Sequence, residues 1–199
     1  MSKEKDESLL KKVVRGPSLG YTDNFPKRQM WEDIANEQNG EFKIKHTASH
    51  DIEMHNISIP HKKWNIEISV SDSRPLKFEI SFVSSQDFQL TLSLEDFIER
   101  IFKIFSKPEI QLGWKDFDKR YLIKSNRSDL VKKTLTKEIQ RALLKHNVYA
   151  ISYHSDSKSQ SSELISVIQR KSGSKEMLIE LIKMFKLLID NLESARVIK

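Results

Sequence analysis

Two aspartates separated by one residue, Asp116 and Asp118, have the spacing of a carboxylate pair that could bind a metal ion. If this segment is extended, side chains two residues apart point the same way and could ligate one divalent cation beside a phosphate-bearing substrate. Three cations, Lys115, Lys119 and Arg120, flank the pair. Ion pairing with these neighbours in an exposed turn is the simpler interpretation, because such short motifs often occur by chance.

Histidines form a second candidate set, since four of the six fall within 16 residues: His46, His50, His55 and His61. His46 and His50 would share a face on a strand or a helix, whereas His55 has the wrong parity to join them on an uninterrupted strand. A metal site needs ligands that converge on one point. We predict exposed imidazoles on a loop and strand edge and no bound metal. His46 and His50, like Asp116 and Asp118, remain the alternative metal ligands.

Several catalytic classes are excluded by composition and motif. The chain has no cysteine, which excludes disulfides, thiolate metal sites and thiol nucleophiles. It also lacks a Gly-x-Ser-x-Gly motif and a glycine-rich phosphate loop. Ser152 and His154 are near each other without a visible third partner. We predict no cofactor and favour a protein that is not an enzyme. The alternative is an enzyme for an anionic substrate, with Asp116, Asp118, Arg120 and the histidines as candidates.

The charge of the chain is unevenly distributed. The net charge is +6, and residues 118–145 contain nine cations against three anions, so this window carries the whole excess. Within it, an amphipathic helix is expected over 128–146, with an apolar face and four basic residues at intervals of four. The apolar residues are Val131, Leu135, Ile139, Ala142 and Leu143, and the basic residues are Lys133, Lys137, Arg141 and Lys145.

A solvated helix face is the simpler interpretation of these basic residues. The functional alternative is a binding surface for an acidic protein, nucleic acid or anionic lipid. A groove beside Trp114 is the alternative binding surface, and Arg120 is a further candidate binding residue. Nucleic-acid binding is the less favoured form, because the aromatic residues alternate into the inferred core and no nucleic-acid-binding motif is present. The candidate binding residues are therefore Lys133, Lys137, Arg141, Lys145, Trp114 and Arg120.

One segment of the chain has a familiar pattern. It is Asp116-Phe-Asp-Lys-Arg-Tyr-Leu-Ile-Lys-Ser-Asn126, followed by the basic helix. This strand, polar turn and helix resembles the core of an uncharacterised bacterial family of domains of unknown function. A helix containing Trp31 and ending at Gly40, and a strand led by Trp64, agree with that resemblance. The resemblance implies an α+β fold and supplies no reaction and no catalytic residues. Related chains often have N-terminal membrane-spanning segments, which this chain lacks.

The periodicity of the hydrophobic residues predicts the strands and helices that would position these candidate residues. Period-two alternation predicts strands around residues 42–44, 57–59, 64–70, 78–82, 88–92, 120–124, 148–153 and 164–169. Helices are predicted near 26–39, 94–106, 128–146 and 174–194. The one-sided alternation favours an α+β fold, with a mainly antiparallel, curved sheet and about four helices packed on one face. Residues 78–105 and 149–192 share the order strand, turn, strand, helix, so a duplicated β-β-α unit is an alternative.

The boundaries of the chain complete these expectations. Residues 1–23 are predicted to be a flexible arm, and 24–199 a single domain. Without an apolar leader or a run of 18 apolar residues, we predict a soluble cytoplasmic protein without a membrane span. The last helix is apolar around most of its circumference. Burial against the sheet is favoured for it, and a homodimer through this helix is the alternative.

Overall fold

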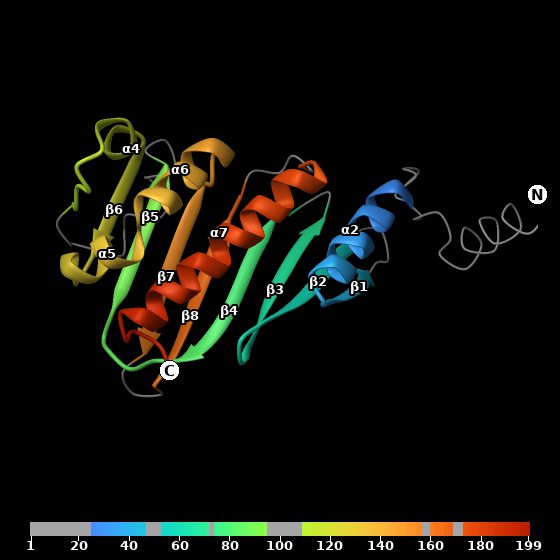
Figure 1. Cartoon of the computed structure of the whole chain (residues 1–199), viewed down its shortest axis with the longest axis horizontal. Helices are drawn as coiled ribbons and strands as arrows, with labels where there is room; N and C mark the ends of the chain where they lie inside the picture. The colour runs from blue at the N-terminus through green and yellow to red at the C-terminus, as the bar shows by residue number, and fades with distance from the viewer. Residues whose placement is uncertain (1–24, 47–52, 72–73, 95–108, 157–159, 169–172) are drawn as a thin grey trace, which may run out of the picture.

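The structure of the protein is a computed structural model that describes residues 25–46, 53–71, 74–94, 109–156, 160–168 and 173–199 (Figure 1). The arm predicted for residues 1–23 lies outside these residues. So does the helix predicted for 94–106, apart from its first residue. The described chain combines helices with one open sheet, which confirms the predicted α+β class.

Eight strands form this sheet, and every neighbouring pair is antiparallel. The strands are β1 (Glu41–His46), β2 (Glu53–His61), β3 (Trp64–Ser71), β4 (Lys77–Val83), β5 (Gln89–Leu94), β6 (Tyr121–Ser125), β7 (Ala150–Asp156) and β8 (Ser161–Val167). Their order across the sheet is β1-β2-β3-β4-β8-β7-β5-β6. The sheet does not close into a barrel, so β1 and β6 are its two edges (Figure 1).

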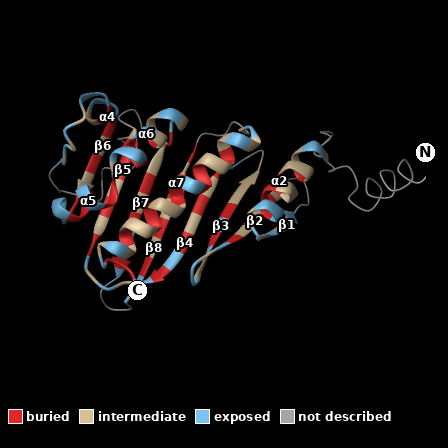
Figure 2. Cartoon of the chain, viewed as in Figure 1, coloured by how far each residue is buried: buried red, intermediate tan, exposed pale blue. Residues whose placement is uncertain are grey.

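One face of the sheet forms the core, and the strand register shows why. Cross-strand partners lie on the same face, and one such row runs through almost the whole sheet. It contains Ile57, Ile68, Phe78, Ser166, Ile151, Leu92 and Ile123, all buried (Figure 2). The next row, on the opposite face, contains mostly polar side chains that are exposed or half-buried. The predicted one-sided alternation is thus the pattern that buries this face.

Five helices accompany the described strands. They are α2 (Phe25–Glu37), α4 (Lys115–Arg120), α5 (Ser128–Thr134), α6 (Lys137–His146) and α7 (Lys175–Ser194). In Figure 1, α7 runs diagonally across β7, β8 and β4, and α2 lies over β1 and β2. The predicted set of four helices needs revision, because residues 128–146 form two helices and α4 was not predicted. A layer of four helices on one face is therefore not established.

The helix predicted to end at Gly40 ends at Glu37. Asn39, with φ of 54°, takes the left-handed conformation after it. Gly40 is needed because a Cβ atom there would collide with the carbonyl oxygen of Ser58 on β2. The glycine lets the chain turn from α2 into β1 while lying directly against the neighbouring strand.

The strand order overturns two local predictions. The order strand, turn, strand predicted from residue 78 onward implied a hairpin of the strands now labelled β4 and β5, but those strands are not neighbours. The β7–β8 hairpin lies between them, with β8 paired to β4 and β7 paired to β5. The duplicated β-β-α unit is not formed either, because only the second copy contains a paired hairpin.

The last helix uses its apolar surface within the chain. Eight apolar side chains of α7 are buried: Leu178, Leu181, Ile182, Met184, Phe185, Leu188, Ile189 and Leu192. Each contributes about 1.5–3 kcal/mol when fully buried. Across the described residues, the one large hydrophobic side chain that is clearly exposed is Val83, on β4. In the same residues, no helix has the length and apolar character needed to cross a membrane.

Candidate functional site

The basic helix predicted over 128–146 is broken at Leu135, whose φ and ψ of −92° and 67° are not helical. Side chains satisfy the two carbonyl groups that the break releases. The Thr134 carbonyl accepts a hydrogen bond from Asn191 Nδ2 at 3.0 Å, and the Leu135 carbonyl accepts one from Gln140 Nε2 at 2.7 Å. The break separates α5 from α6, and α6 packs alongside α7.

The polar turn before α5 does not cap the helix with a side chain. Arg127 is the N-cap residue, and it makes no side-chain cap hydrogen bond. The Asn126 side chain instead joins two strand ends, since its Oδ1 accepts from the Gln89 amide at 2.8 Å. Ser125 Oγ accepts a hydrogen bond from the Arg127 amide at 3.1 Å. The polar turn was predicted correctly as a turn, but its side chains link β6 to β5.

Trp114 and Arg120 are tied to neighbouring side chains. The Lys137 ammonium group lies 5.0 Å from the centre of the Trp114 ring, which is a cation–π contact. Trp114 stacks on the buried ring of Phe117 at the start of α4. Arg120 donates a hydrogen bond to Asn147 Oδ1 at 2.6 Å. Three of the six candidate binding residues therefore brace α4 against the two ends of α6.

The remaining candidates divide into paired and unpaired cations. Lys145 Nζ lies 2.6 Å from Glu180 Oε2 on α7, so its charge is offset. Lys133 and Arg141 are exposed, and neither makes an ion pair with any residue that the structure describes. Arg141 is thus the cation on α6 that is available to a partner.

A groove of about 280 Å³ lies between α6 and α7. Its apolar lining consists of Ile139, Ala142, Met184 and Leu187, and its polar lining consists of Glu138, Arg141, Lys145, His146, Glu180 and Lys183. The polar residues include three permanent cations and two carboxylates. The groove therefore combines an apolar lining with a polar rim whose net charge is slightly positive.

The Glu180 carboxylate organises one side of this groove. It accepts hydrogen bonds from Lys145 at 2.6 Å and from the buried His146 ring at 2.8 Å. These two contacts hold the pKa of Glu180 below its usual value. Because Lys145 is occupied in this way, Arg141 and Lys183 carry the charge that a bound group would meet.

The aspartate pair does not have the geometry assumed from its spacing. Residues 115–120 form α4 rather than an extended segment, so Asp116 and Asp118 point in different directions. Asp118 accepts hydrogen bonds from the backbone amides of Leu112 and Gly113, both at 2.8 Å, and so holds the preceding loop. Asp116 is exposed. The pair has a structural explanation in the loop before α4.

The clustered histidines are less exposed than predicted. His46 is exposed at the end of β1, and His50 lies outside the described residues. His61 is half-buried and lies 2.9 Å from Asp190 on α7, while His55 is buried in the core. No group of three or more His, Cys, Asp or Glu side chains is arranged to hold a metal ion in the described part of the chain.

His55 belongs to a buried charged cluster that was not predicted. Its Nε2 lies 2.5 Å from Glu53 Oε1, and Arg28 on α2 holds both oxygens of the same carboxylate, with Nε at 2.7 Å from Oε1. The His55 ring also packs against the rings of Trp31 and Phe42. The signal was present in the alternation of β2, because residues 53 and 55 share the parity of the core residues at 57 and 59.

The cluster ties α2 to the sheet. Burial opposes the charge on Glu53, but the hydrogen bonds from Arg28 and His55 outweigh it and keep the pKa of Glu53 below its usual value. Breaking such a buried pair commonly costs about 3–5 kcal/mol. Because all three residues are buried, with Glu53 the most exposed of them at 7%, the cluster has a structural role.

With the geometry described, the chain can be compared with known proteins. No protein-family model matches it, and no curated protein matches it. The resemblance to an uncharacterised bacterial family therefore stays a prediction.

A solved structure shares the fold. It is the mycobacterial trehalose monomycolate transport factor A, TtfA, with a TM-score of 0.57 at 8% sequence identity. The similarity covers 86% of this chain and 96% of the TtfA chain. At this identity the likeness extends to the fold alone. The two chains therefore share one arrangement of sheet and helices over most of the length of each.

Proposed function

We propose that this protein is a non-enzymatic binding module that holds an acidic, amphipathic segment of a partner protein in the groove between α6 and α7. The observation that carries the proposal is the groove itself, in which an apolar lining is bordered by Arg141 and Lys183, two cations without an ion pair among the described residues. A helix whose apolar side faces Met184 and Leu187, with carboxylates along its edges, would complement both features.

The charge distribution of the chain supports this kind of partner. The groove adjoins the window 118–145, which carries the entire net excess of six positive charges. Such a local field raises the association rate of an acidic partner and orients it before contact. The fold neighbour is consistent with a binding role, since its name describes a transport factor.

Nucleic-acid binding has less support. Single-stranded nucleic acid needs aromatic side chains on an accessible sheet face, on which bases can stack. On the described strands, the polar face of the sheet carries no Phe, Tyr or Trp. The aromatic residues of these strands alternate onto the core-facing side, and the others lie outside the strands. An enzyme for an anionic substrate also has less support, since Asp118 and Arg120 are occupied by structural hydrogen bonds.

A homodimer through α7 was proposed because that helix is apolar over most of its circumference. The chain itself buries eight of these apolar side chains, so they do not form an exposed apolar surface that a second copy could cover. A polar or weak association remains open to a measurement of mass in solution. Cytoplasmic location likewise remains a prediction.

The groove is tested with a designed peptide, since the natural partner is unidentified. A fluorescent helical peptide of about 15 residues, with leucines on one face and glutamates on the other, should bind with an affinity that falls as salt is raised. Substitution of Arg141→Glu with Lys183→Glu should weaken binding about tenfold or more, which corresponds to roughly 1.4 kcal/mol.

A matched control is available on α4 and α5. Lys119→Glu with Lys132→Glu makes the same change in net charge at exposed positions outside the groove. The proposal requires this control to bind nearly as well as the original protein. Equal weakening by both double variants, or equal binding of a peptide with the same composition in scrambled order, would show general charge attraction instead.

A further inference from the structure

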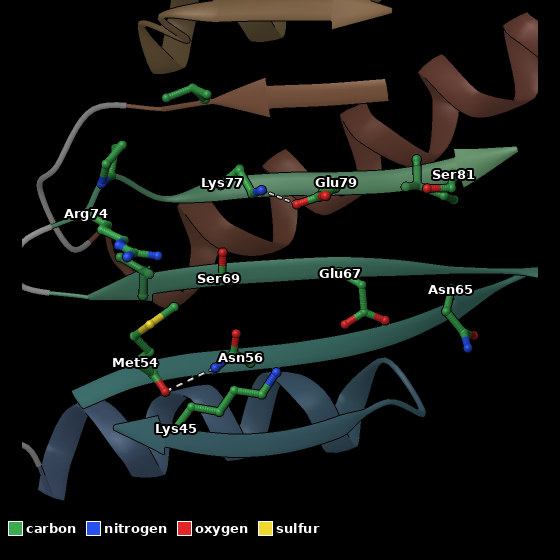
Figure 3. A pocket seen from close by; sticks show the side chains of 14 residues that line it. Lys45, Met54, Asn56, Asn65, Glu67, Ser69, Arg74, Lys77, Glu79 and Ser81 are labelled. Atoms are coloured by element: carbon green, nitrogen blue, oxygen red, sulfur yellow. Dashed lines mark hydrogen bonds and ion pairs between the residues drawn. The ribbon is translucent and has the colours of Figure 1, made fainter. Parts of the chain in front are cut away.

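The polar face of the sheet contains a second and larger hollow, which the proposed function does not use. It has a volume of about 640 Å³ and lies over β1 to β4 (Figure 3). Amide and hydroxyl side chains line much of it, namely Asn56, Asn65, Ser69 and Ser81, together with charged side chains of both signs. This volume is within the range of sites that bind small molecules.

The charges in this hollow are separated along the strands. Glu67 and Glu79 are cross-strand partners, and the next pair on the same face is Ser69 and Lys77. Lys45 lies in the row after that, opposite Met54. Arg74, between β3 and β4, lies at the same end of the hollow as Met54 (Figure 3). Arg74 thus lies at one end of the hollow, and Glu67 and Glu79 lie toward the other, while the Lys45 side chain extends from the Arg74 end toward Glu67 (Figure 3).

These rows have a definite spacing. Successive residues on one face of a strand are about 7 Å apart, so the Lys77 row and the Lys45 row lie about 7 Å and about 14 Å from the carboxylate row. Lys77 forms an ion pair with Glu79. Lys45, Arg74 and Glu67 have no ion pair among the residues that the structure describes. Arg74 and Glu67 thus carry charges of opposite sign toward opposite ends of the hollow, and neither has an ion pair among the described residues.

Another carboxyl group lies on the neighbouring strand, outside the lining of the hollow. Glu163 on β8 lies opposite Ser81 and near Glu79. Burial and the nearby Glu79 raise the pKa of Glu163, while the Lys77 hydrogen bond lowers the pKa of Glu79.

We propose that this hollow binds a small zwitterionic, peptide-like molecule, with its carboxylate beside Arg74 and its ammonium group beside Glu67 and Glu79. A chain of two to four residues spans roughly 7–14 Å, which matches the separation of the two ends. Asn56 and Ser69 lie between the charged ends and can hydrogen-bond the peptide groups of such a ligand. A dianion would meet Glu67, and a dication would meet Arg74, so a ligand with both charges fits best.

The proposal can be tested with triglycine as the probe and two blocked forms as controls. N-acetyl-triglycine lacks the ammonium group, and triglycine amide lacks the carboxylate. In a titration followed by NMR, triglycine should shift amide signals of β2 to β4, and each blocked form should bind about two- to fivefold more weakly, as expected for loss of an exposed ion pair. Diglycine and tetraglycine should show a dependence on length.

Variants of the protein provide a second, independent test of the same site. Arg74→Gln and Glu67→Gln should each weaken triglycine binding about two- to fivefold. Lys119→Gln and Asp116→Asn, at exposed positions of α4, should leave it unchanged.

Three results would overturn the proposal. They are equal binding of triglycine and its blocked forms, amide shifts confined to elements other than β2 to β4, and no shift with any of the three glycine peptides. The blocked-peptide comparison uses the unchanged protein, so it decides the question even if a variant fails to fold.

Discussion

Glu53 accepts hydrogen bonds from two other buried side chains, Arg28 and His55, and so forms a charged group inside the core. These two partners come from different elements, since Arg28 is on α2 and His55 is on β2. Burial lowers the pKa of His55 below 6.5, because a charged ring would lose its hydration, although the hydrogen bond to Glu53 opposes this effect. The folded protein therefore favours a neutral His55.

This shift predicts how stability depends on pH. Between the lowered pKa of His55 in the folded state and its ordinary value of 6.5, the unfolded chain binds more protons, so stability must fall as pH is lowered through this window. The loss is at most about 1.4 kcal/mol for each pH unit crossed. Urea unfolding at about pH 7.5 and about pH 5.5 measures it.

His55→Gln should lose less stability than the original protein over the same interval, because glutamine does not titrate and can still donate to Glu53. His154→Gln, at an exposed position of β7, is the matched control and should behave like the original protein. If His55→Gln keeps the full pH dependence, another group is responsible for it.

The residue scale also shows what could be foreseen from sequence. The parity of β2 placed residues 53 and 55 on the core side, so the cluster was predictable in principle from alternation alone. Its third member was not, because nothing in the sequence around Arg28 distinguishes it from the exposed cations of a surface helix. A contact between residues 25 positions apart depends on where α2 packs.

At the scale of elements, the break between α5 and α6 creates the groove beside α7. Periodicity alone predicted one helix, since the buried residues Val131, Leu135, Ile139 and Leu143 are spaced as on a continuous helix. The break was missed because its cause is not periodic. It is stabilised by two side-chain donors, Gln140 on α6 and Asn191 on α7, the second of which is distant in sequence.

Gln140 provides a test of this explanation. Gln140→Met keeps the length of the side chain but removes the donor to the Leu135 carbonyl, and leaving that buried group unpaired costs about 1–3 kcal/mol. Part of this cost is offset, because Gln140 Oε1 is itself buried and has no partner among the described residues. We therefore expect a loss of about 1 kcal/mol in urea unfolding.

The control for Gln140→Met is Lys133→Met at an exposed position of α5, which should change stability by less than about 0.5 kcal/mol. Asn191→Ala should behave like Gln140→Met, since it removes the donor to the Thr134 carbonyl. If neither substitution at the break lowers stability, the two carbonyl groups are satisfied in another way.

At the scale of the whole molecule, the strand order joins distant parts of the chain. Alternation predicted the strands and their buried face, because the positions of the apolar residues within each strand show which of its sides is buried. It did not predict that β7 and β8 lie between β4 and β5, since any apolar face could pack beside any other. The centre of the sheet therefore consists of two segments, 77–94 and 150–167, that are separated by more than 50 residues.

This arrangement predicts a gradient of protection in amide hydrogen exchange. Strands β4, β8, β7 and β5 each have neighbours on both sides, and α7 crosses three of them, so their amides should open only with global unfolding. β1 contains no buried residue and pairs with β2 alone, so its amides should exchange fastest. β6 should be intermediate, because the Ile110 amide donates to Ile123 along its outer edge.

The measurement is native-state exchange followed by NMR at several low concentrations of urea. Because β4 and β8 come from distant parts of the chain, equal opening free energies for both would show that the two segments unfold as one cooperative unit. A β2–β3 hairpin that outlasts the central strands would contradict the prediction, since it would mean that local pairing is more stable than the assembly of the sheet centre.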